Sequence, residues 1–395
     1  MSSPSNYPAH RWTLLGVFLL STTINYLDRQ TLANVAPQIM AEFRLTTAEY
    51  GWILAAFSLT YAAAAPFAGL LIDGLGLTRG ICLAIGVWSL AGIATGLGTG
   101  LASLIVFRAI LGLAEAGGIP ATGKAIRLFL PPAERALGTS LNQAALSLGL
   151  ILAPPLAVWI ARQAGWRAAF LVTGALGLLW IPLWLRMAPR AGGAGRSAPL
   201  DFTLARDPRV WGFGLASALS LVLQSFWANF TFLYLTREAG AEPARAAWLA
   251  TLPPLVATVG GFAGGARTWR LIRGGSPPFP ARLRVCGQAA VAALVTAAIP
   301  WMPNALLATL AISAGLFAVS AFSVNMYAIP LDAYPAERAG FAISVLTFCY
   351  GVMQAVISPW FGAVIDRFGY APICVGASLT PLAGWWLLRR LERAA

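Results

Sequence analysis

The sequence predicts an all-α integral membrane protein with twelve transmembrane helices in two six-helix halves related by pseudo-two-fold symmetry. Composition is the first reason: 58% of the 395 residues are hydrophobic and 10% are charged, whereas roughly a quarter are charged in ordinary globular chains. The second is that hydrophobic residues recur in stretches of about 20, the length that crosses a hydrocarbon core of roughly 30 Å. The third is an internal repeat. A chain with so few charged residues cannot cover a water-facing surface, so the lipid bilayer is its surrounding solvent.

Twelve hydrophobic stretches, bounded by proline, glycine and charged residues, are the expected spans. The first stretch is followed directly by Asp28 and Arg29 and has no small-residue cleavage pattern, so we interpret it as a helix and not as a signal peptide. The spans are expected near residues 12–35, 49–72, 80–100, 102–126, 138–161 and 166–187 in the first half, and near 209–236, 245–265, 283–301, 305–331, 340–364 and 371–389 in the second.

The repeat is visible in the residues themselves. Pro132-Ala133-Glu134-Arg135-Ala136 recurs as Pro335-Ala336-Glu337-Arg338-Ala339, displaced by 203, and Pro155 and Pro359, displaced by 204, each lie ten residues before a glycine and an aromatic residue. Two matches in the same order indicate a duplication. Because each half then holds six spans, the halves run parallel about an axis along the membrane normal. The predicted domains are two six-helix bundles, residues 1–187 and 209–395, and a cytoplasmic linker, residues 188–208.

Basic residues set the predicted orientation. Of the 27 Lys and Arg residues, 18 fall in segments on the side of the N-terminus, six on the opposite side and three within spans. This excess predicts a multi-pass protein of the inner (plasma) membrane with both termini in the cytoplasm. The formal charge of +13 raises the alternative of a nucleic-acid partner, but such a partner requires basic residues grouped on one soluble face. We therefore expect no nucleic acid.

Cysteine and histidine offer no metal or cofactor site. The four cysteines, Cys82, Cys286, Cys349 and Cys374, are scattered through hydrophobic stretches without the spacing of a disulfide framework or a metal site. The single histidine, His10, precedes the first span, which excludes a histidine proton relay inside the membrane. We expect neither a metal nor another cofactor.

Several motifs resemble a known family. The loop Gly69-Leu-Leu-Ile-Asp73-Gly-Leu-Gly76-Leu-Thr-Arg79, after the second span, resembles the signature loop of the major facilitator superfamily. Three further motifs resemble its anion:cation symporter branch, which includes bacterial hexuronate and galactonate transporters. They are Asn25-Tyr26-Leu27-Asp28-Arg29, the stretch that begins with Arg108 and ends Glu115-Ala-Gly-Gly-Ile-Pro120, and the Pro-Ala-Glu-Arg loop. The resemblance runs along nearly the whole chain and is strongest in residues 12–170. It implies that the first and fourth helices line a central cavity.

Four ionisable residues lie well inside the predicted spans: Asp28 and Arg29 in the first, and Arg108 and Glu115 in the fourth. Lys124 lies near the inner face, where its side chain is expected to snorkel. Each of the four costs about 2.5–3.5 kcal/mol at a helix centre, and together they cost on the order of 10–14 kcal/mol. Ion pairs that only lock two helices together are the structural alternative, but replacing such pairs by hydrophobic residues is often neutral or stabilising. A functional use explains them better.

The arginines indicate the class of substrate. A guanidinium binds a carboxylate with two N–H groups and stays charged at cellular pH, so the substrate is expected to be an organic anion. Burial favours the protonated form of a carboxyl group and a nearby arginine favours the charged form, so a bound anion can decide whether an acid holds a proton. The resemblance implies that Arg29 binds the substrate carboxylate, that Asp28 and Glu115 are the proton-coupling acids, and that Arg108 is their partner.

Neutral polar side chains within the spans suit a hydroxylated anion, because they both donate and accept hydrogen bonds. Each also has the alternative use of holding helices together. Besides Arg29 and Arg108, those predicted to bind the substrate are Tyr61, Gln143, Trp227, Asn325, Tyr350 and Gln354.

These observations predict a secondary active transporter that takes up a sugar acid, such as a hexuronate or aldonate, by alternating access. The coupling ion is expected to be H⁺, and the protein is expected to act as a monomer in the bilayer. Transport of small monocarboxylates, efflux by a pump of the same superfamily and a non-transporting sensor remain alternatives, because one fold can host several functions. An enzyme is not expected, because no Ser, Cys or Asp motif has an evident base.

Overall fold

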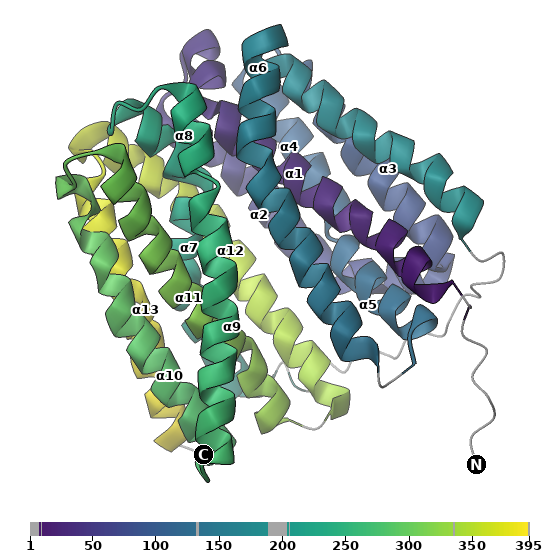
Figure 1. Ribbon diagram of the computed structural model, residues 1–395, viewed down its shortest axis with the longest axis vertical. Coiled ribbons are helices and arrows are strands. Elements are labelled where there is room, and N and C mark those ends of the chain that lie inside the picture. The colour runs from purple at the N-terminus through teal and green to yellow at the C-terminus, as the bar shows by residue number, and fades with distance from the viewer. Residues whose placement is uncertain are drawn as a thin grey trace. The chain divides into compact units, whose positions relative to one another are not determined.

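The computed structural model describes residues 8, 10–131, 134–188, 204, 206–334 and 336–393. These residues form helices joined by short turns, and none of them lies in a strand (Figure 1). Most of the predicted linker, and parts of both Pro-Ala-Glu-Arg loops, lie outside the described residues. The helices of the first half are α1 (Arg11–Phe43), α2 (Thr47–Leu75), α3 (Leu77–Gly96), α4 (Leu101–Glu115), α5 (Gly118–Phe129) and α6 (Arg135–Met187). Those of the second half are α7 (Pro208–Arg237), α8 (Pro243–Leu249), α9 (Leu252–Arg273), α10 (Pro278–Ala292), the 3₁₀ helix η3 (Ala293–Trp301), α11 (Ala305–Ala333), α12 (Ala336–Phe368) and α13 (Ala371–Arg393).

Twelve spans follow from these helices, as the sequence predicts. In the described residues, nine helical segments are long and hydrophobic enough to cross a membrane, and the bent helix α2 adds a tenth. Helix α6 is interrupted at Gly165, whose φ of 81° is not helical, so it forms two spans and adds an eleventh. The twelfth is α1, which has 33 residues and is made more polar by Asp28 and Arg29. The predicted fold class is confirmed.

Two boundaries differ from the prediction. Helix α1 continues eight residues past the expected end at residue 35. It continues through Pro37, which a membrane helix tolerates. The expected span over residues 102–126 is divided into α4 and α5 at Ala116 and Gly117. The break is consistent with the sequence that follows, since Pro120 has no backbone N–H to donate to the preceding turn.

The duplicated sequence is matched by duplicated turns. Gly165 and Gly369 have φ values of 81° and 72°, a left-handed conformation that glycine adopts without steric cost. Each precedes the last span of its half and is followed by an aromatic residue, Trp166 or Tyr370. The repeat in the sequence therefore corresponds to the same tight turn in both halves.

The chain forms two compact units. Unit 1 holds Met1–Val35 and Ala63–Ala198, and unit 2 holds Ala36–Ala62 and Pro199–Ala395. The end of α1 and the first part of α2 thus belong to the same unit as the second half of the sequence. The predicted domains describe the two sequence halves, and they stay a prediction.

Close backbone contacts hold the segment Ala36–Ala62 in unit 2. A Cβ atom at Gly362 on α12 would overlap the backbone of Thr47, so only glycine permits this approach. The Asp366 carboxylate accepts hydrogen bonds from the backbone N–H groups of Thr47 and Ala48, at 3.0 and 2.9 Å. It thereby satisfies two donors at the start of α2, where a helix favours negative charge.

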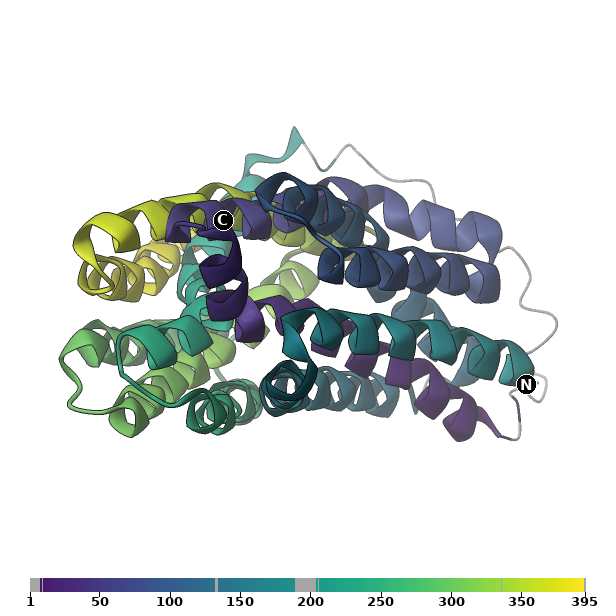
Figure 2. The ribbon, with the colours of Figure 1, turned by 90° about the horizontal axis from the view of Figure 1, so that it is seen from above.

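The remaining helices pack within their own units. In unit 2, α9 packs against α11, and α13 packs against α7 and α10. Figure 2 shows α12 and α13, in yellow, side by side. In unit 1, α3 packs against both α4 and α6. The packing of α3 against α4 and α6 determines the surroundings of the charged residues in unit 1.

An ion pair lies at one end of unit 1. Arg11, at the start of α1, donates hydrogen bonds to both carboxylate oxygens of Glu134, each at 2.8 Å. These bonds lower the pKa of Glu134 below its usual value. The pair is solvent-accessible, so it adds little to stability, but it connects the first span to the start of the fifth.

Candidate substrate and proton site

A buried ion pair joins the first and fourth spans. Arg29 donates from Nε to Oε2 of Glu115 at 2.8 Å, and its Nη2 lies 2.6 Å from the same oxygen. The Glu115 side chain is 0% exposed, whereas the Arg29 side chain keeps 24% exposure. Arg29 is therefore the more exposed member of the pair.

Two further residues of α1 complete the surroundings of this pair. The ring centroid of Tyr26 lies 5.0 Å from the guanidinium carbon of Arg29. Asn25, one helical turn before Arg29, places its side chain beside the Glu115 carboxylate. Neither residue is among the predicted site residues. Their spacing of three and four residues from Arg29 is the signal that would have found them, since such residues share a helix face.

Arg108 lies two helical turns before Glu115 on α4 and is 3% exposed. Its guanidinium carbon lies 5.6 Å from the ring centroid of Phe170 on α6. A ring face in this position stabilises a buried positive charge. Arg108 acts electrostatically on both Glu115 and Asp28, as Arg29 does. The structure thus gathers the four predicted charged residues into one cluster.

Asp28 points to a different side of α1 from Arg29, as neighbouring helix residues do. Its Oδ1 accepts a hydrogen bond of 2.6 Å from the hydroxyl of Thr173 on α6. A Cβ atom at Gly92 on α3 would lie 3.0 Å from each of the two carboxylate oxygens. Asp28 is 2% exposed. The two predicted proton-coupling acids therefore lie in separate surroundings.

Small residues bring α3 and α6 close enough to enclose Asp28. A Cβ atom at Gly174 would lie 2.7 Å from the carbonyl oxygen of Ser89, and one at Gly96 would lie 2.9 Å from a backbone oxygen of α6. Close approach through small residues is typical of membrane helices. A side chain at either position would push the two helices apart and draw Thr173 away from Asp28.

Lys124 has a partner in the loop that resembles the superfamily signature. Its Nζ lies 2.8 Å from Oδ1 of Asp73 and donates to the carbonyl oxygen of Ile72 at 3.2 Å. Ile72 and Asp73 lie near the end of α2, whereas Lys124 lies on α5. The sequence predicted a snorkelling side chain, and the structure gives its ammonium group a defined ion pair.

The neutral residues predicted to bind substrate are divided between the units. Gln143 on α6 is exposed and belongs to unit 1. Tyr61 on α2, together with Tyr350 and Gln354 on α12, is half-buried in unit 2. Trp227 on α7 is buried, with 1% exposure. Their contribution to substrate binding stays a prediction.

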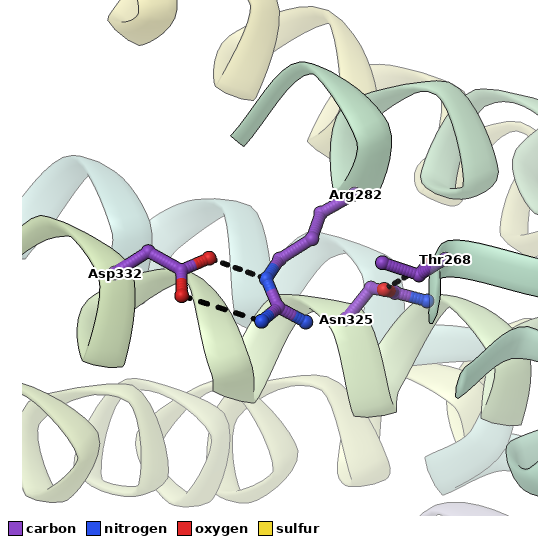
Figure 3. Close-up of polar contacts among 4 residues, drawn as sticks. All are labelled: Thr268, Arg282, Asn325 and Asp332. Atoms are coloured by element: carbon purple, nitrogen blue, oxygen red, sulfur yellow. Dashed lines mark hydrogen bonds and ion pairs between the residues drawn. The ribbon is translucent and has the colours of Figure 1, made fainter. Parts of the chain in front are cut away.

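Asn325 is buried among helix contacts of unit 2. Its Oδ1 accepts a hydrogen bond of 2.6 Å from the Thr268 hydroxyl on α9, and its Nδ2 donates to the carbonyl oxygen of Ala321 at 2.9 Å (Figure 3). Farther along α11, Asp332 accepts hydrogen bonds from Arg282 on α10 at 2.5 and 3.3 Å (Figure 3). One polar end of Asn325 thus binds the neighbouring helix α9 and the other binds the backbone of α11 itself. Holding helices together is the alternative role that the sequence left open.

Thr268→Val is expected to lower thermal stability and to leave substrate affinity unchanged within about twofold. Valine keeps the shape of threonine but leaves the buried carbonyl of Asn325 without its donor. Such a bond contributes about 0.6–1.7 kcal/mol within a membrane. Melting of the purified protein and substrate titration measure the two effects. A loss of affinity beyond about fivefold at unchanged stability would instead make Asn325 a substrate ligand.

Comparisons with known proteins find a matching family model and relatives that cover nearly the whole chain. A family model described as Major Facilitator Superfamily matches residues 18–358. The hexuronate transporter of Escherichia coli (strain K12) is 26% identical, over 95% of this chain and 92% of that protein. The D-galactonate transporter of Escherichia coli O6:H1 is 27% identical, over 95% of this chain and 94% of that protein.

A solved structure shares the fold. The bacterial homolog to the human lysosomal transporter Spinster, in its inward-facing and occupied conformation, superposes with a TM-score of 0.77 over 98% of this chain and 96% of that chain. At 20% sequence identity the likeness concerns the fold alone. The family match over residues 18–358, together with this shared fold, shows that the chain is a membrane transport protein of the Major Facilitator Superfamily.

Proposed function

We propose that this protein takes up a sugar acid, such as a hexuronate or an aldonate, in symport with protons. The observation that carries the proposal is the ion pair between Arg29 and Glu115. Its arginine is 24% exposed and its carboxylate is fully buried. A substrate carboxylate that reaches Arg29 must compete with Glu115 for the same N–H groups.

Protonation resolves this competition. A protonated Glu115 no longer attracts the guanidinium strongly, so two N–H groups of Arg29 become available to the substrate carboxylate. Binding of the anion and binding of the proton then favour each other, and linkage makes this preference reciprocal. Substrate affinity should therefore weaken as the pH rises through the range in which the acids lose their protons. Asp28 is the second acid that can contribute.

The sugar-acid class is supported by the relatives. Proteins that align with nearly the whole chain are named for the transport of hexuronates and D-galactonate. Both kinds of substrate combine one carboxylate with several hydroxyl groups. Arg29, with Arg108 beside it in the cluster, suits the carboxylate, while Gln143, Tyr61, Tyr350, Gln354 and Trp227 are our candidates for the hydroxyl groups, as the sequence predicts.

The setting of this transporter is part of the proposal. The distribution of Lys and Arg supports an inner (plasma) membrane protein with both termini in the cytoplasm. We propose that it works as a monomer by alternating access, with H⁺ as the coupling ion and no other cofactor.

Counterflow into liposomes tests the substrate class. Vesicles containing the purified protein and loaded with an unlabelled acid are placed in a trace of the same acid in labelled form. We expect D-galacturonate, D-glucuronate or D-galactonate to support label entry, and lactate and acetate to support none. Equal exchange of the small acids would favour the monocarboxylate alternative, and exchange of none of these acids would contradict the proposal.

A further inference from the structure

The Asp28 carboxylate has two oxygens in unequal surroundings. Oδ1 accepts a hydrogen bond of 2.6 Å from the Thr173 hydroxyl, whereas Oδ2 accepts none from any described residue. The same hydroxyl lies 3.3 Å from the carbonyl oxygen of Phe170, one turn earlier on α6. Because a hydroxyl carries a single proton, the shorter contact shows that it is directed at Asp28.

We propose that Thr173 is a positioning residue for the coupling proton: its hydroxyl holds Oδ1 of Asp28 and leaves Oδ2 as the oxygen that takes and releases the proton. The proposal rests on the proposed function, because it assigns a part in proton coupling. The proton adds to Oδ2 as Asp28 becomes neutral and leaves from the same atom. Thr173 keeps its own proton throughout and exchanges none.

The surroundings of Asp28 explain why this one hydroxyl matters. The charged groups that act on Asp28 are Arg29 on α1 and Arg108 and Glu115 on α4. The two other helices against it supply uncharged groups, Gly92 from α3 and Thr173 from α6. Gly92 leaves room for the carboxylate and contributes no side-chain donor, so the hydroxyl is what fixes the direction of the acid.

The Thr173 bond also connects Asp28 to the rest of the cluster. The carbonyl oxygen of Phe170 lies beside the hydroxyl, and the ring of Phe170 lies 5.6 Å from the guanidinium carbon of Arg108. One short segment of α6 therefore touches both the acid of the first span and the arginine of the fourth.

A valine at position 173 tests the proposal, since it keeps the shape of threonine and removes the hydroxyl. Hydrogen bonds to a charged group are about twice as strong as those to a neutral one, so the charged form of Asp28 loses more than the protonated form. Release of the proton becomes harder. We expect the pH at which substrate affinity has fallen by half to move upward by about 0.5–1 unit in Thr173→Val, with affinity at low pH unchanged.

Three further variants separate this role from packing. Thr173→Ser retains the hydroxyl and should keep the original pH profile. Thr95→Val on α3 removes another buried hydroxyl, one that donates to the backbone of its own helix at 2.8 Å, and should also keep the profile. In an Asp28→Asn background, Thr173→Val should produce no further shift, because the acid on which it acts is gone.

An unchanged or downward-shifted profile in Thr173→Val would overturn the proposal while leaving proton-coupled transport in place. The proposed function fails in a different way, through an absence of proton-driven uptake in the unmodified protein. If the valine variant does not fold, Thr173→Ala removes the same hydroxyl with less steric demand and is subject to the same criteria.

Discussion

Arg29→Lys is expected to weaken substrate binding about tenfold or more, although the positive charge is retained. In the structure Nε and Nη2 of Arg29 both contact Glu115, at 2.8 and 2.6 Å, so the guanidinium already engages a carboxylate through two groups. Lysine has one ammonium group and cannot reproduce this fork. Loss of one hydrogen bond between charged groups costs about 1.5–3 kcal/mol, which corresponds to roughly ten- to a hundredfold in affinity.

The measurement is a titration of purified protein with a hexuronate at low pH, where Glu115 competes least. A matched control is Arg282→Lys in unit 2, which makes the same change in an arginine that also contacts a carboxylate with two nitrogens. The control should bind the substrate as tightly as the unmodified protein. If Arg29→Lys retains affinity within about threefold, Arg29 is not the carboxylate clamp.

Glu115→Gln is expected to abolish accumulation of substrate driven by a pH gradient while leaving exchange across the membrane intact. Glutamine has nearly the same shape as glutamic acid and stays neutral, so it resembles the protonated residue that leaves Arg29 available to substrate. It cannot release a proton, so a pH gradient no longer drives net uptake. Counterflow should remain within about threefold, whereas gradient-driven accumulation should fall to the equilibrium level.

The matched control for this variant is Glu134→Gln, which removes a carboxylate that also binds an arginine but lies outside the spans. That change should leave accumulation in place. Accumulation that survives in Glu115→Gln would show that Glu115 is not required for coupling and would leave Asp28 as the coupling acid. Asp28→Asn would then be expected to show the behaviour described for Glu115→Gln.

The sequence predicted the fold and the charged cluster for the same physical reason. Charges are costly in hydrocarbon, so the hydrophobic stretches mark the spans and the few charges within them mark a site. Arg108 and Glu115 lie seven residues apart, and this spacing was enough to predict that their side chains project from the same face of one helix. The ion pair that joins the first and fourth spans is between Arg29 and Glu115, whereas Arg108 was the expected partner of the acids.

Other features depend on packing between distant parts of the chain. Thr173 lies 145 residues after Asp28, and no local pattern links them, because their contact depends on glycines that bring α3 and α6 together. Asn325 illustrates the opposite case. A polar residue in a span suggests a ligand, but whether its amide faces substrate or a neighbour such as Thr268 is decided by how the helices are rotated about their axes.

The most direct measurement of the central claim is uptake of a labelled sugar acid into proteoliposomes with imposed ion gradients. Arg29 and Arg108 act electrostatically on both Asp28 and Glu115, so the account predicts accumulation when the outside is more acidic than the inside. It predicts none with a sodium gradient at constant pH. Accumulation that follows the sodium gradient and ignores the proton gradient would contradict it.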